Sequence, residues 1–184
     1  ALALDYAHRQ GVIHRDIKPE NVMLQEGEGL VADFGIAKAV EAAGSEHLTQ
    51  TGVAVGTPAY MSPEQAAGER EPDGRSDVYS VGIMLYEMLC GQAPFTGPSA
   101  QAVITRRFLE DAPLVRATRP EVPPDIERTV AKALARAPEQ RFETAALLAA
   151  ALVMRSGAMP SGGAPVTVLL PTEPEGKSVA VLPF

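Results

Sequence analysis

Apolar residues recur at helical spacing in several parts of the chain. Within residues 1–10, Leu4 and Ala7 share one face while Asp5 lies with polar residues on another, which predicts the end of an amphipathic helix. The glycine that follows is expected to terminate this helix. Residues 77–89 leave almost no polar face, and a helix that is apolar all round belongs in the middle of a core.

Two further helices are expected in the second half of the chain. Residues 123–125, Pro-Pro-Asp, open the first of them. Its apolar side chains repeat at helical spacing at Ile126, Val130, Ala133 and Leu134. A final helix is expected to begin near Thr144. Residues 91–98 are rich in Gly and Pro and predict a turn.

Two short apolar runs, residues 22–24 and 30–32, predict a small β-hairpin. Gly27 and Gly29 lie between them, as turn chemistry favours. These glycines do not resemble a phosphate-binding loop, because no helix and no Lys-Ser/Thr pair follows them. Asp33 comes directly after the second run, so a carboxylate is expected at the end of a strand.

Composition indicates an ordinary folded domain with an acidic balance. The 184 residues are 46% hydrophobic and 21% charged, which suits one good core and a tail. The net charge of -7 argues against nucleic acid as a partner, because phosphate backbones favour basic surfaces. Cys90 is the only cysteine, which excludes an intrachain disulfide and a multi-cysteine metal site, and we expect it to be a small buried apolar residue.

The composition changes near the end of the chain. Residues 155–176 are rich in Gly, Pro and Ser and are expected to form a linker. The apolar runs 166–170 and 178–182 predict two short strands. No apolar run reaches the roughly 18 residues of a membrane-spanning helix. The chain starts without Met inside a predicted helix, so the natural start of the protein is expected upstream.

Reactive side chains gather in residues 14–21, which read H-R-D-I-K-P-E-N. Asp16, Lys18 and Asn21 are expected in a loop, because the proline among them forbids a regular helix through the segment. Asn21 and the carboxylates of Asp16 and Asp33 are hard oxygen ligands. Such ligands suit Mg²⁺ with its bound waters and phosphates, whereas zinc would require His or Cys.

Three segments together resemble the eukaryotic-like serine/threonine protein kinases of bacteria: residues 14–21, the D-F-G of residues 33–35, and residues 56–64, G-T-P-A-Y-M-S-P-E. Ser62 stands where the family usually has Ala. The resemblance implies a mainly α fold, namely the C-terminal lobe of a kinase with a small β-hairpin at the catalytic cleft and without the N-terminal lobe. It assigns residues 1–154 to the kinase domain.

The resemblance also implies the chemistry of the site. Asp16 would orient the substrate hydroxyl and accept its proton, Lys18 would neutralise charge on the transferred phosphoryl group, and Thr57 would bond both and select Ser or Thr. ATP and Mg²⁺ are the implied cofactors, with Mn²⁺ as an alternative, and Asn21 and Asp33 would hold the metal. The residues implied to bind ATP are Lys18, Glu20, Asn21, Met23 and Asp33.

A regulatory loop is implied at residues 39–55, the activation segment of the family. Thr49 and Thr51 stand where bacterial members are phosphorylated, and Arg15 and Lys38 would hold the phosphate. The alternative interpretation of this segment is a solvated polar loop.

Other residues are expected to support the site. Asp77 would accept backbone donors of the catalytic loop, and Glu64 would pair with Arg141. The full set expected to be structural is His14, Phe34, Gly35, Glu64, Asp77 and Arg141. We expect His8 to be a partly buried helix residue without a chemical role.

The Gly-rich loop, strand lysine and helix glutamate of a complete kinase are not found in this sequence, so the chain is expected to be inactive alone. Residues 177–184 resemble the opening strand of a TolB-like domain. The implied partners are protein substrates with Ser or Thr and a second copy of the kinase for trans-autophosphorylation, without nucleic acid or a membrane segment, and the kinase domain is expected in the cytoplasm. The alternative is a non-catalytic pseudokinase lobe that binds protein partners, but the complete set Asp16, Lys18, Asn21 and Asp33 favours an enzyme.

Overall fold

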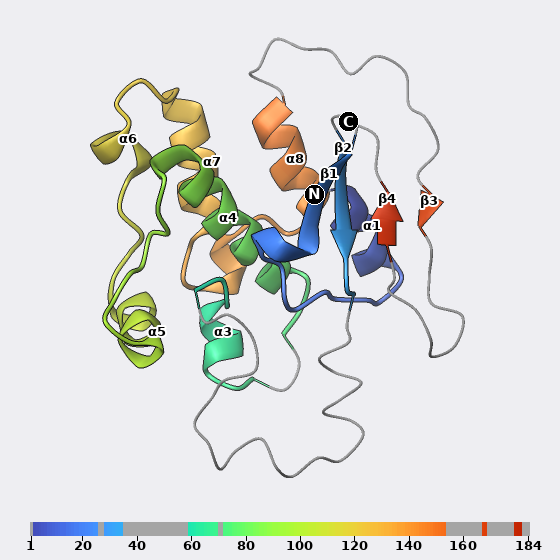
Figure 1. Cartoon of the computed structure of the whole chain (residues 1–184), viewed down its shortest axis with the longest axis horizontal. Helices are drawn as coiled ribbons and strands as arrows, with labels where there is room; N and C mark the ends of the chain where they lie inside the picture. Colours follow the sequence, from blue (N-terminus) through green and yellow to red (C-terminus); the bar gives the residue numbers. More distant parts are fainter. Residues whose placement is uncertain are drawn as a thin grey trace.

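The structure, a computed structural model, describes residues 2–25, 28–34, 59–69, 72–153, 167–168 and 179–181. In chain order its elements are α1 (Leu2–Arg9), η1 (Pro19–Asn21, a 3₁₀ turn), β1 (Val22–Gln25), β2 (Glu28–Ala32), α3 (Pro63–Ala66), α4 (Arg75–Cys90), α5 (Ala100–Leu109), α6 (Val115–Thr118), α7 (Pro124–Ala133), η2 (Pro138–Gln140, a second 3₁₀ turn), α8 (Ala145–Val153), β3 (Thr167–Val168) and β4 (Val179–Val181). The fold is mainly helical with a small antiparallel sheet, which confirms the predicted class (Figure 1).

Helix α4 lies at the centre of the core. Figure 1 shows it with α6 and α7 on one side and α1, β1 and β2 on the other. Val78 of α4 belongs to an apolar cluster that includes residues of α1 and α8, whereas Tyr79 and Ile83 belong to a second cluster with residues of α6 and α7. Because its side chains enter both clusters, α4 holds the two halves of the core together.

The helix predicted over residues 77–89 is therefore present, and it begins two residues earlier. The expectation that it is buried all round is wrong at Met88, which is 76% exposed. Cys90 is only partly buried against the second cluster. An apolar sequence permits burial, but a neighbouring element has to cover each turn of the helix for burial to occur.

Helix α1 matches its prediction except at Asp5. Leu4 and Ala7 are buried as expected, but Asp5, which the helical pattern placed on the polar face, is only 6% exposed. Its Oδ1 accepts a hydrogen bond from the backbone N–H of Ala146 at 3.2 Å, and its Oδ2 pairs with Arg9 at 2.7 Å. The carboxylate is buried because it satisfies a free N–H at the start of α8, which a single-helix pattern cannot reveal.

The predicted hairpin is present as β1 and β2, paired antiparallel with Val22 opposite Val31. The two strands predicted near the end of the chain are also present, as the shorter β3 and β4. They extend the hairpin into a four-stranded sheet of order β1-β2-β4-β3, in which Ala180 of β4 lies opposite Val31. The division of this end into a linker and the start of a second domain stays a prediction.

The helices predicted after residues 123–125 and near Thr144 are confirmed as α7 and α8. Thr144 caps α8 through its Oγ1, which accepts from the N–H of Leu147 at 3.2 Å. Helix α5 was not predicted, although Ser99 caps it by accepting from the N–H of Ala102 at 3.2 Å. Its only fully buried side chain is that of Arg107, so its sequence lacks a clear apolar stripe. None of the helices in the described ranges combines the length and apolar character needed to cross a membrane.

Candidate active site

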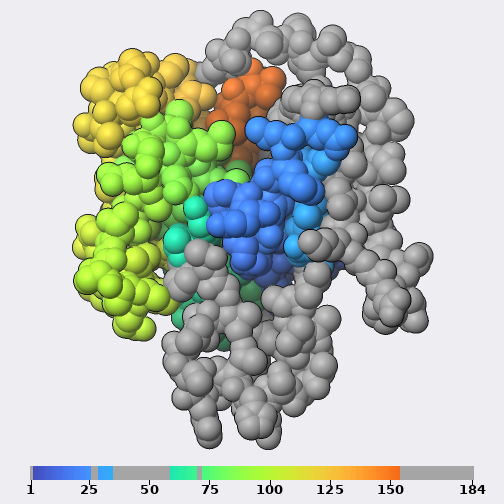
Figure 2. All heavy atoms as spheres, in the orientation of Figure 1, coloured from blue at the N-terminus to red at the C-terminus, as the bar shows by residue number. Residues whose placement is uncertain are grey.

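The loop that the resemblance implies to be catalytic, residues 12–21, is called the catalytic loop below, and it buries His14, Ile17 and Asn21 while the residues between them are half-exposed or exposed. Ile17 is buried in the core, and Asp16 and Lys18 lie half-exposed on either side of it. The proline that follows opens η1, and this turn brings Asn21 back towards Asp16. In the space-filling view, the blue atoms of the segment up to residue 25 reach the surface of the viewed face (Figure 2).

Asp16 is held through one of its two carboxylate oxygens. Lys18 Nζ lies 2.8 Å from Asp16 Oδ2, and Asn21 Nδ2 donates to the same oxygen at 3.2 Å and to the backbone carbonyl of Asp16 at 2.8 Å. Among the described residues, no hydrogen bond to Oδ1 of Asp16 is present. Oδ2 is therefore fixed, and Oδ1, which no described residue contacts by a hydrogen bond, can accept a proton or a hydroxyl hydrogen.

Asp77, in the first turn of α4, holds the catalytic loop by accepting hydrogen bonds from its backbone. Its Oδ2 accepts from the N–H of His14 and its Oδ1 from the N–H of Arg15, both at 2.8 Å. Arg15 has a φ of 68°, in the left-handed region that non-glycine residues adopt at a cost of about 1–2 kcal/mol. Asp77 is fully buried, so its negative charge finds its partners in these donors. The arrangement expected for Asp77 is present.

His8 also bonds to Asp77, which the sequence did not suggest. Its Nε2 lies 2.7 Å from Asp77 Oδ2. The ring packs over Gly74, where an added Cβ would lie only 2.5 Å from His8 Nδ1. His8 is thus part of the support of the catalytic loop. In the sequence, the one hint of this contact is Gly74, three residues before Asp77. That hint can be interpreted only when the structure brings residues 74–77 next to His8.

His14 connects the catalytic loop to the end of β2. Its Nδ1 accepts from the N–H of Asp16 at 3.3 Å, so the proton of the neutral ring lies on Nε2, which donates to the carbonyl of Ala32 at 2.8 Å. The ring also packs against Phe34 with the centroids 4.7 Å apart. His14 is therefore a buried link between the peptide of Asp16 and the residue that precedes Asp33.

The sheet register brings Asn21 and Asp33 to neighbouring positions. Val22 pairs with Val31, so Asn21, one residue earlier, lies opposite Ala32, which directly precedes Asp33. Asn21 donates two hydrogen bonds through Nδ2, and its Oδ1, which has no partner among the described residues, is a hard oxygen acceptor. Asp33 has a φ of 61° and a half-buried side chain without an ion pair among the described residues. One amide and one carboxylate oxygen fit Mg²⁺, which takes few protein ligands and completes its shell with water and phosphate.

No described group of three or more His, Cys, Asp and Glu side chains could hold a metal by itself. The other predicted ATP contacts are more open: Met23 is 46% exposed and Glu20 is also exposed. Gly35, Lys38, Thr49, Thr51 and Thr57 lie outside the described residues, so their predicted roles stay predictions.

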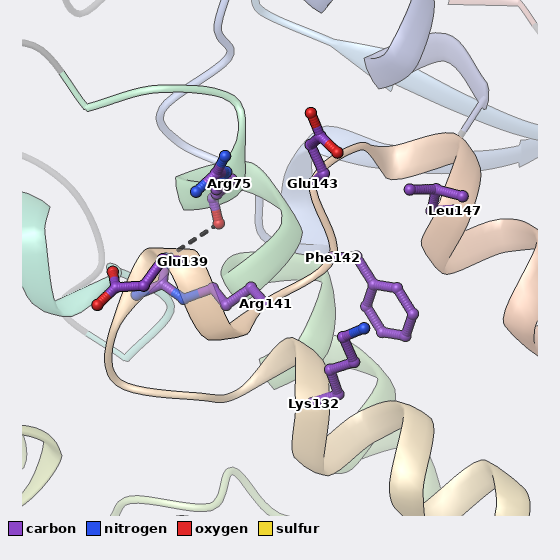
Figure 3. A pocket seen from close by; sticks show the side chains of 7 residues that line it. All are labelled: Arg75, Lys132, Glu139, Arg141, Phe142, Glu143 and Leu147. Atoms are coloured by element: carbon purple, nitrogen blue, oxygen red, sulfur yellow. Dashed lines mark hydrogen bonds between the residues drawn. The ribbon is translucent and has the colours of Figure 1, made fainter.

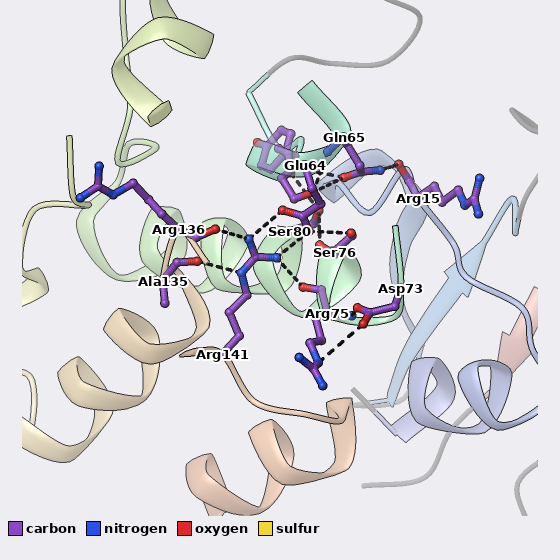
Figure 4. Close-up of polar contacts among 12 residues, drawn as sticks. Arg15, Glu64, Gln65, Asp73, Arg75, Ser76, Ser80, Ala135, Arg136 and Arg141 are labelled. Atoms are coloured by element: carbon purple, nitrogen blue, oxygen red, sulfur yellow. Dashed lines mark hydrogen bonds and ion pairs between the residues drawn. The ribbon is translucent and has the colours of Figure 1, made fainter. Parts of the chain in front are cut away.

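Glu64 and Arg141 form a bidentate ion pair at the base of the site. The distances are 2.6 Å from Arg141 Nη1 to Glu64 Oε1 and 2.8 Å from Arg141 Nη2 to Glu64 Oε2. Arg141 also donates to the backbone carbonyls of three other residues, Arg75, Ala135 and Arg136 (Figure 4). The pair expected from the resemblance is present, and its guanidinium fastens α3 to the start of α4 and to the segment after α7.

The charge of Glu64 is stabilised where it lies. Burial by itself raises the pKa of its carboxyl, but the hydrogen bonds from Arg141 and Ser76 outweigh burial and hold the pKa below its ordinary value. Ser76 Oγ donates to Glu64 Oε1 at 2.7 Å. Arg141 also lies over the ring of Tyr79, 4.8 Å from its centroid. Burial raises the pKa of the Tyr79 hydroxyl to about 12, so Tyr79 stays neutral beside the guanidinium of Arg141.

The described surface has a hollow of about 400 Å³ beside Arg141, away from the catalytic loop (Figure 3). It is lined by Arg75, Lys132, Glu139, Arg141, Phe142, Glu143 and Leu147. Lys132 lies over the ring of Phe142 at 4.5 Å from its centroid. The lining mixes both signs of charge and shares no residue with the Asp16 cluster, so this hollow is not where the predicted chemistry would take place.

Comparisons with known proteins show the family of the chain. The family model described as "Protein kinase domain" matches residues 1–153. The chain is 41% identical to the serine/threonine-protein kinase PknB of Mycolicibacterium smegmatis over 182 residues, which cover 98% of the chain and 28% of that protein. It is 46% identical to PknB of Mycobacterium tuberculosis over 153 residues, covering 82% of the chain and 24% of that protein.

A third relative is the serine/threonine-protein kinase PknL of Mycobacterium tuberculosis, 46% identical over 147 residues, which cover 79% of the chain and 36% of that protein. The chain thus spans between 24% and 36% of the length of these curated relatives. The motifs at Asp16, Asp33 and Glu64 lie within the matched residues. The chain therefore belongs to the protein kinase family.

Proposed function

We propose that the protein containing this chain is a serine/threonine kinase that transfers the γ-phosphoryl group of ATP to the hydroxyls of protein substrates. The observation that carries the proposal is the asymmetric binding of Asp16. Lys18 and Asn21 hold its Oδ2, while Oδ1 has no donor among the described residues. A carboxylate on a fixed loop, with one oxygen that no described residue occupies, is an arrangement that suits a hydroxyl nucleophile.

In this proposal Asp16 Oδ1 accepts the hydrogen of a Ser or Thr hydroxyl and aligns its oxygen with the γ-phosphorus. A bond forms between that oxygen and phosphorus, the bond to the β–γ bridging oxygen breaks, ADP leaves, and Asp16 takes the proton. Lys18, 2.8 Å from Asp16, places an ammonium beside the group that is transferred. Its positive charge lowers the energy of the charge that builds on the phosphoryl oxygens.

Protein kinases use ATP with a divalent metal, which neutralises the phosphates when it is bound. In this chain Asn21 and Asp33 would hold Mg²⁺, because the strand register brings the two residues to neighbouring positions at the end of the hairpin. Met23, exposed on β1, would contact the adenine. His14 would keep the two halves of the site in register, since it bonds to the peptide of Asp16 on one side and to Ala32 on the other.

The proposal also includes regulation of the kinase activity by phosphorylation of Thr49 or Thr51. Figure 4 shows the side chain of Arg15 extending away from the polar network, and its guanidinium has no partner among the described residues. This arginine, next to Asp16, can pair with a phosphate carried by Thr49 or Thr51, with Lys38 as a second cation. Mass spectrometry of the active full-length protein should find phosphate on one of these threonines. Full activity without it would contradict this part alone.

Transfer of labelled phosphate from ATP by the full-length protein tests the main proposal. Asp16→Asn keeps the shape of the side chain and one oxygen that can accept from Lys18 and Asn21, but it removes the base. Turnover should therefore fall by about 10²–10⁴-fold. The control is Asp111→Asn, the same change at a carboxylate whose side chain is 84% exposed. Equal loss in both variants, or no transfer by the wild-type protein, would refute the kinase activity and favour a binding role for the lobe.

A further inference from the structure

Gln65 crosses from the short helix α3 to the catalytic loop. Its Nε2 donates to the backbone carbonyl of Arg15 at 2.7 Å, across fifty positions of the sequence. Figure 4 shows this side chain reaching from α3 to Arg15, on the opposite side of the network from Arg141. Neither the motifs nor the proposed phosphoryl transfer gives Gln65 a role.

The chemistry around the Gln65 amide determines which way it faces. Its Oε1 accepts from both the N–H and the Oγ of Ser62, each at 3.0 Å. Its Nε2 faces a carbonyl, which can only accept. The reversed amide would direct N–H groups at the Ser62 N–H and an oxygen at the Arg15 carbonyl. Only the observed orientation satisfies both ends, so the amide is a directed link and not an incidental contact.

Arg15 is consequently held at both of its backbone polar groups. Asp77 Oδ1 accepts from its N–H at 2.8 Å, and Gln65 donates to its carbonyl at 2.7 Å. That carbonyl belongs to the same peptide plane as the N–H of Asp16, which bonds to His14. The left-handed φ of Arg15 is sterically unfavourable, so the surrounding hydrogen bonds have to maintain this orientation of the peptide plane.

We infer that Gln65 is a positioning residue that fixes the peptide group between Arg15 and Asp16. Through this contact, residues 59–69 are coupled to the proposed catalytic base, Asp16. The expected effect of Gln65 on turnover rests on the proposed kinase function, whereas its expected effect on the conformation of the catalytic loop does not. Ser62 and Gln65 also form a reciprocal cap at the start of α3. A displacement of α3 would therefore move the peptide group of Asp16 through the side-chain amide of Gln65.

Gln65→Glu in the full-length protein separates the link from the cap. Glutamate retains the oxygen that accepts from Ser62, as in an ordinary capping box, but it replaces the donor with an oxygen that repels the Arg15 carbonyl. Ser62→Ala does the reverse, since it removes the capping hydroxyl and leaves the Gln65 donor. Gln101→Glu makes the same chemical change on the exposed surface of α5 and serves as the matched control.

Hydrogen exchange and kinetics provide the two measurements. In Gln65→Glu, amide exchange of residues 12–18 should become faster while exchange in the middle of α4 stays unchanged. The kcat should fall by about tenfold to a hundredfold with the KM for ATP within about twofold, because the base is misplaced and the nucleotide contacts are intact. Ser62→Ala should lower the melting temperature and leave kcat near the wild-type value, and Gln101→Glu should change neither.

Unchanged exchange in residues 12–18 of Gln65→Glu would overturn the inference, as would faster exchange with an unaltered kcat. A larger loss of kcat in Ser62→Ala than in Gln65→Glu would also overturn it, since the cap and not the link would then matter. If the wild-type protein transfers no phosphate, the proposed function fails, and hydrogen exchange still decides whether Gln65 holds the loop.

Discussion

The Glu64–Arg141 pair offers the sharpest test of the energetics, because its two halves are not equivalent. The Arg141 side chain is fully buried and makes five hydrogen bonds, two to Glu64 and three to backbone carbonyls. Glu64→Ala removes the carboxylate, but the guanidinium keeps the three carbonyl partners. Breaking a buried pair from one side costs about 3–5 kcal/mol, and we expect this variant near the lower end, at about 3 kcal/mol.

Arg141→Ala should be more harmful. Among the described residues it leaves the buried carboxylate of Glu64 with Ser76 as its side-chain donor, and it removes the donor from three backbone carbonyls. Each buried carbonyl that loses its partner costs about 1–3 kcal/mol, less where water can enter, so the total should reach about 5 kcal/mol or more. The double variant should cost about 2 kcal/mol less than the sum of the single variants.

Scanning calorimetry of the full-length protein, read at the transition of the kinase domain, measures these differences. At about 2–4 °C per kcal/mol for a domain of this size, Glu64→Ala should melt about 6–12 °C lower and Arg141→Ala lower still. Arg128→Ala, the same truncation at an exposed arginine paired with Asp125 along α7, should cost about 0.5 kcal/mol or less. If Glu64→Ala were the more harmful variant, or if Arg141→Ala matched Arg128→Ala, the assigned roles would be wrong.

Three further predictions follow from contacts that support the site. The hydrogen bonds from Arg141 and Ser76 lower the pKa of Glu64, so the pair's contribution should be complete above the ordinary glutamate pKa of about 4.3 and be lost as the pH falls below it. Urea unfolding at pH 7, 5, 4 and 3 should therefore show a smaller loss of stability on acidification in Glu64→Gln than in the wild type. Gly74→Ala places a methyl group 2.5 Å from His8 and should cost about 1–3 kcal/mol, and because His8→Ala empties that space, calorimetry of the double variant should show less than the additive loss. Asp5→Ala removes the acceptor from the N–H of Ala146 and should cost about 0.5–2 kcal/mol, whereas Asp5→Asn should retain most of that stability in the same measurement.

Local sequence patterns were sufficient for the elements with strong periodicity or turn chemistry. The apolar run of α4, the glycine-separated strands β1 and β2, and the Pro-Pro-Asp start of α7 each contain their own signal and appear within a few residues of the predicted bounds. Helix α5 was missed because it buries an arginine rather than an apolar stripe. Local patterning reports on a helix only where one face of it is apolar.

The chemical residues were recognisable because the order of residue types within residues 14–21 and at Asp33 is that of the kinase family. What no pattern could supply is the set of long-range partners that hold them. Asp77 bonds to a loop about sixty positions away, His8 and Gln65 turn out to support that loop, and Asp5 is buried because it caps a helix at the other end of the chain.

By itself, the sequence determined the kinase family, the residue types of the catalytic loop and most of the helices, since these depend on short-range order and local backbone preferences. The tertiary structure alone decided which oxygen of Asp16 is held, which tautomer His14 adopts, and how Arg15 is kept in a left-handed conformation. Hydrogen bonds act over about 3 Å between residues that the sequence places far apart. Their geometry therefore exists only after the chain has folded.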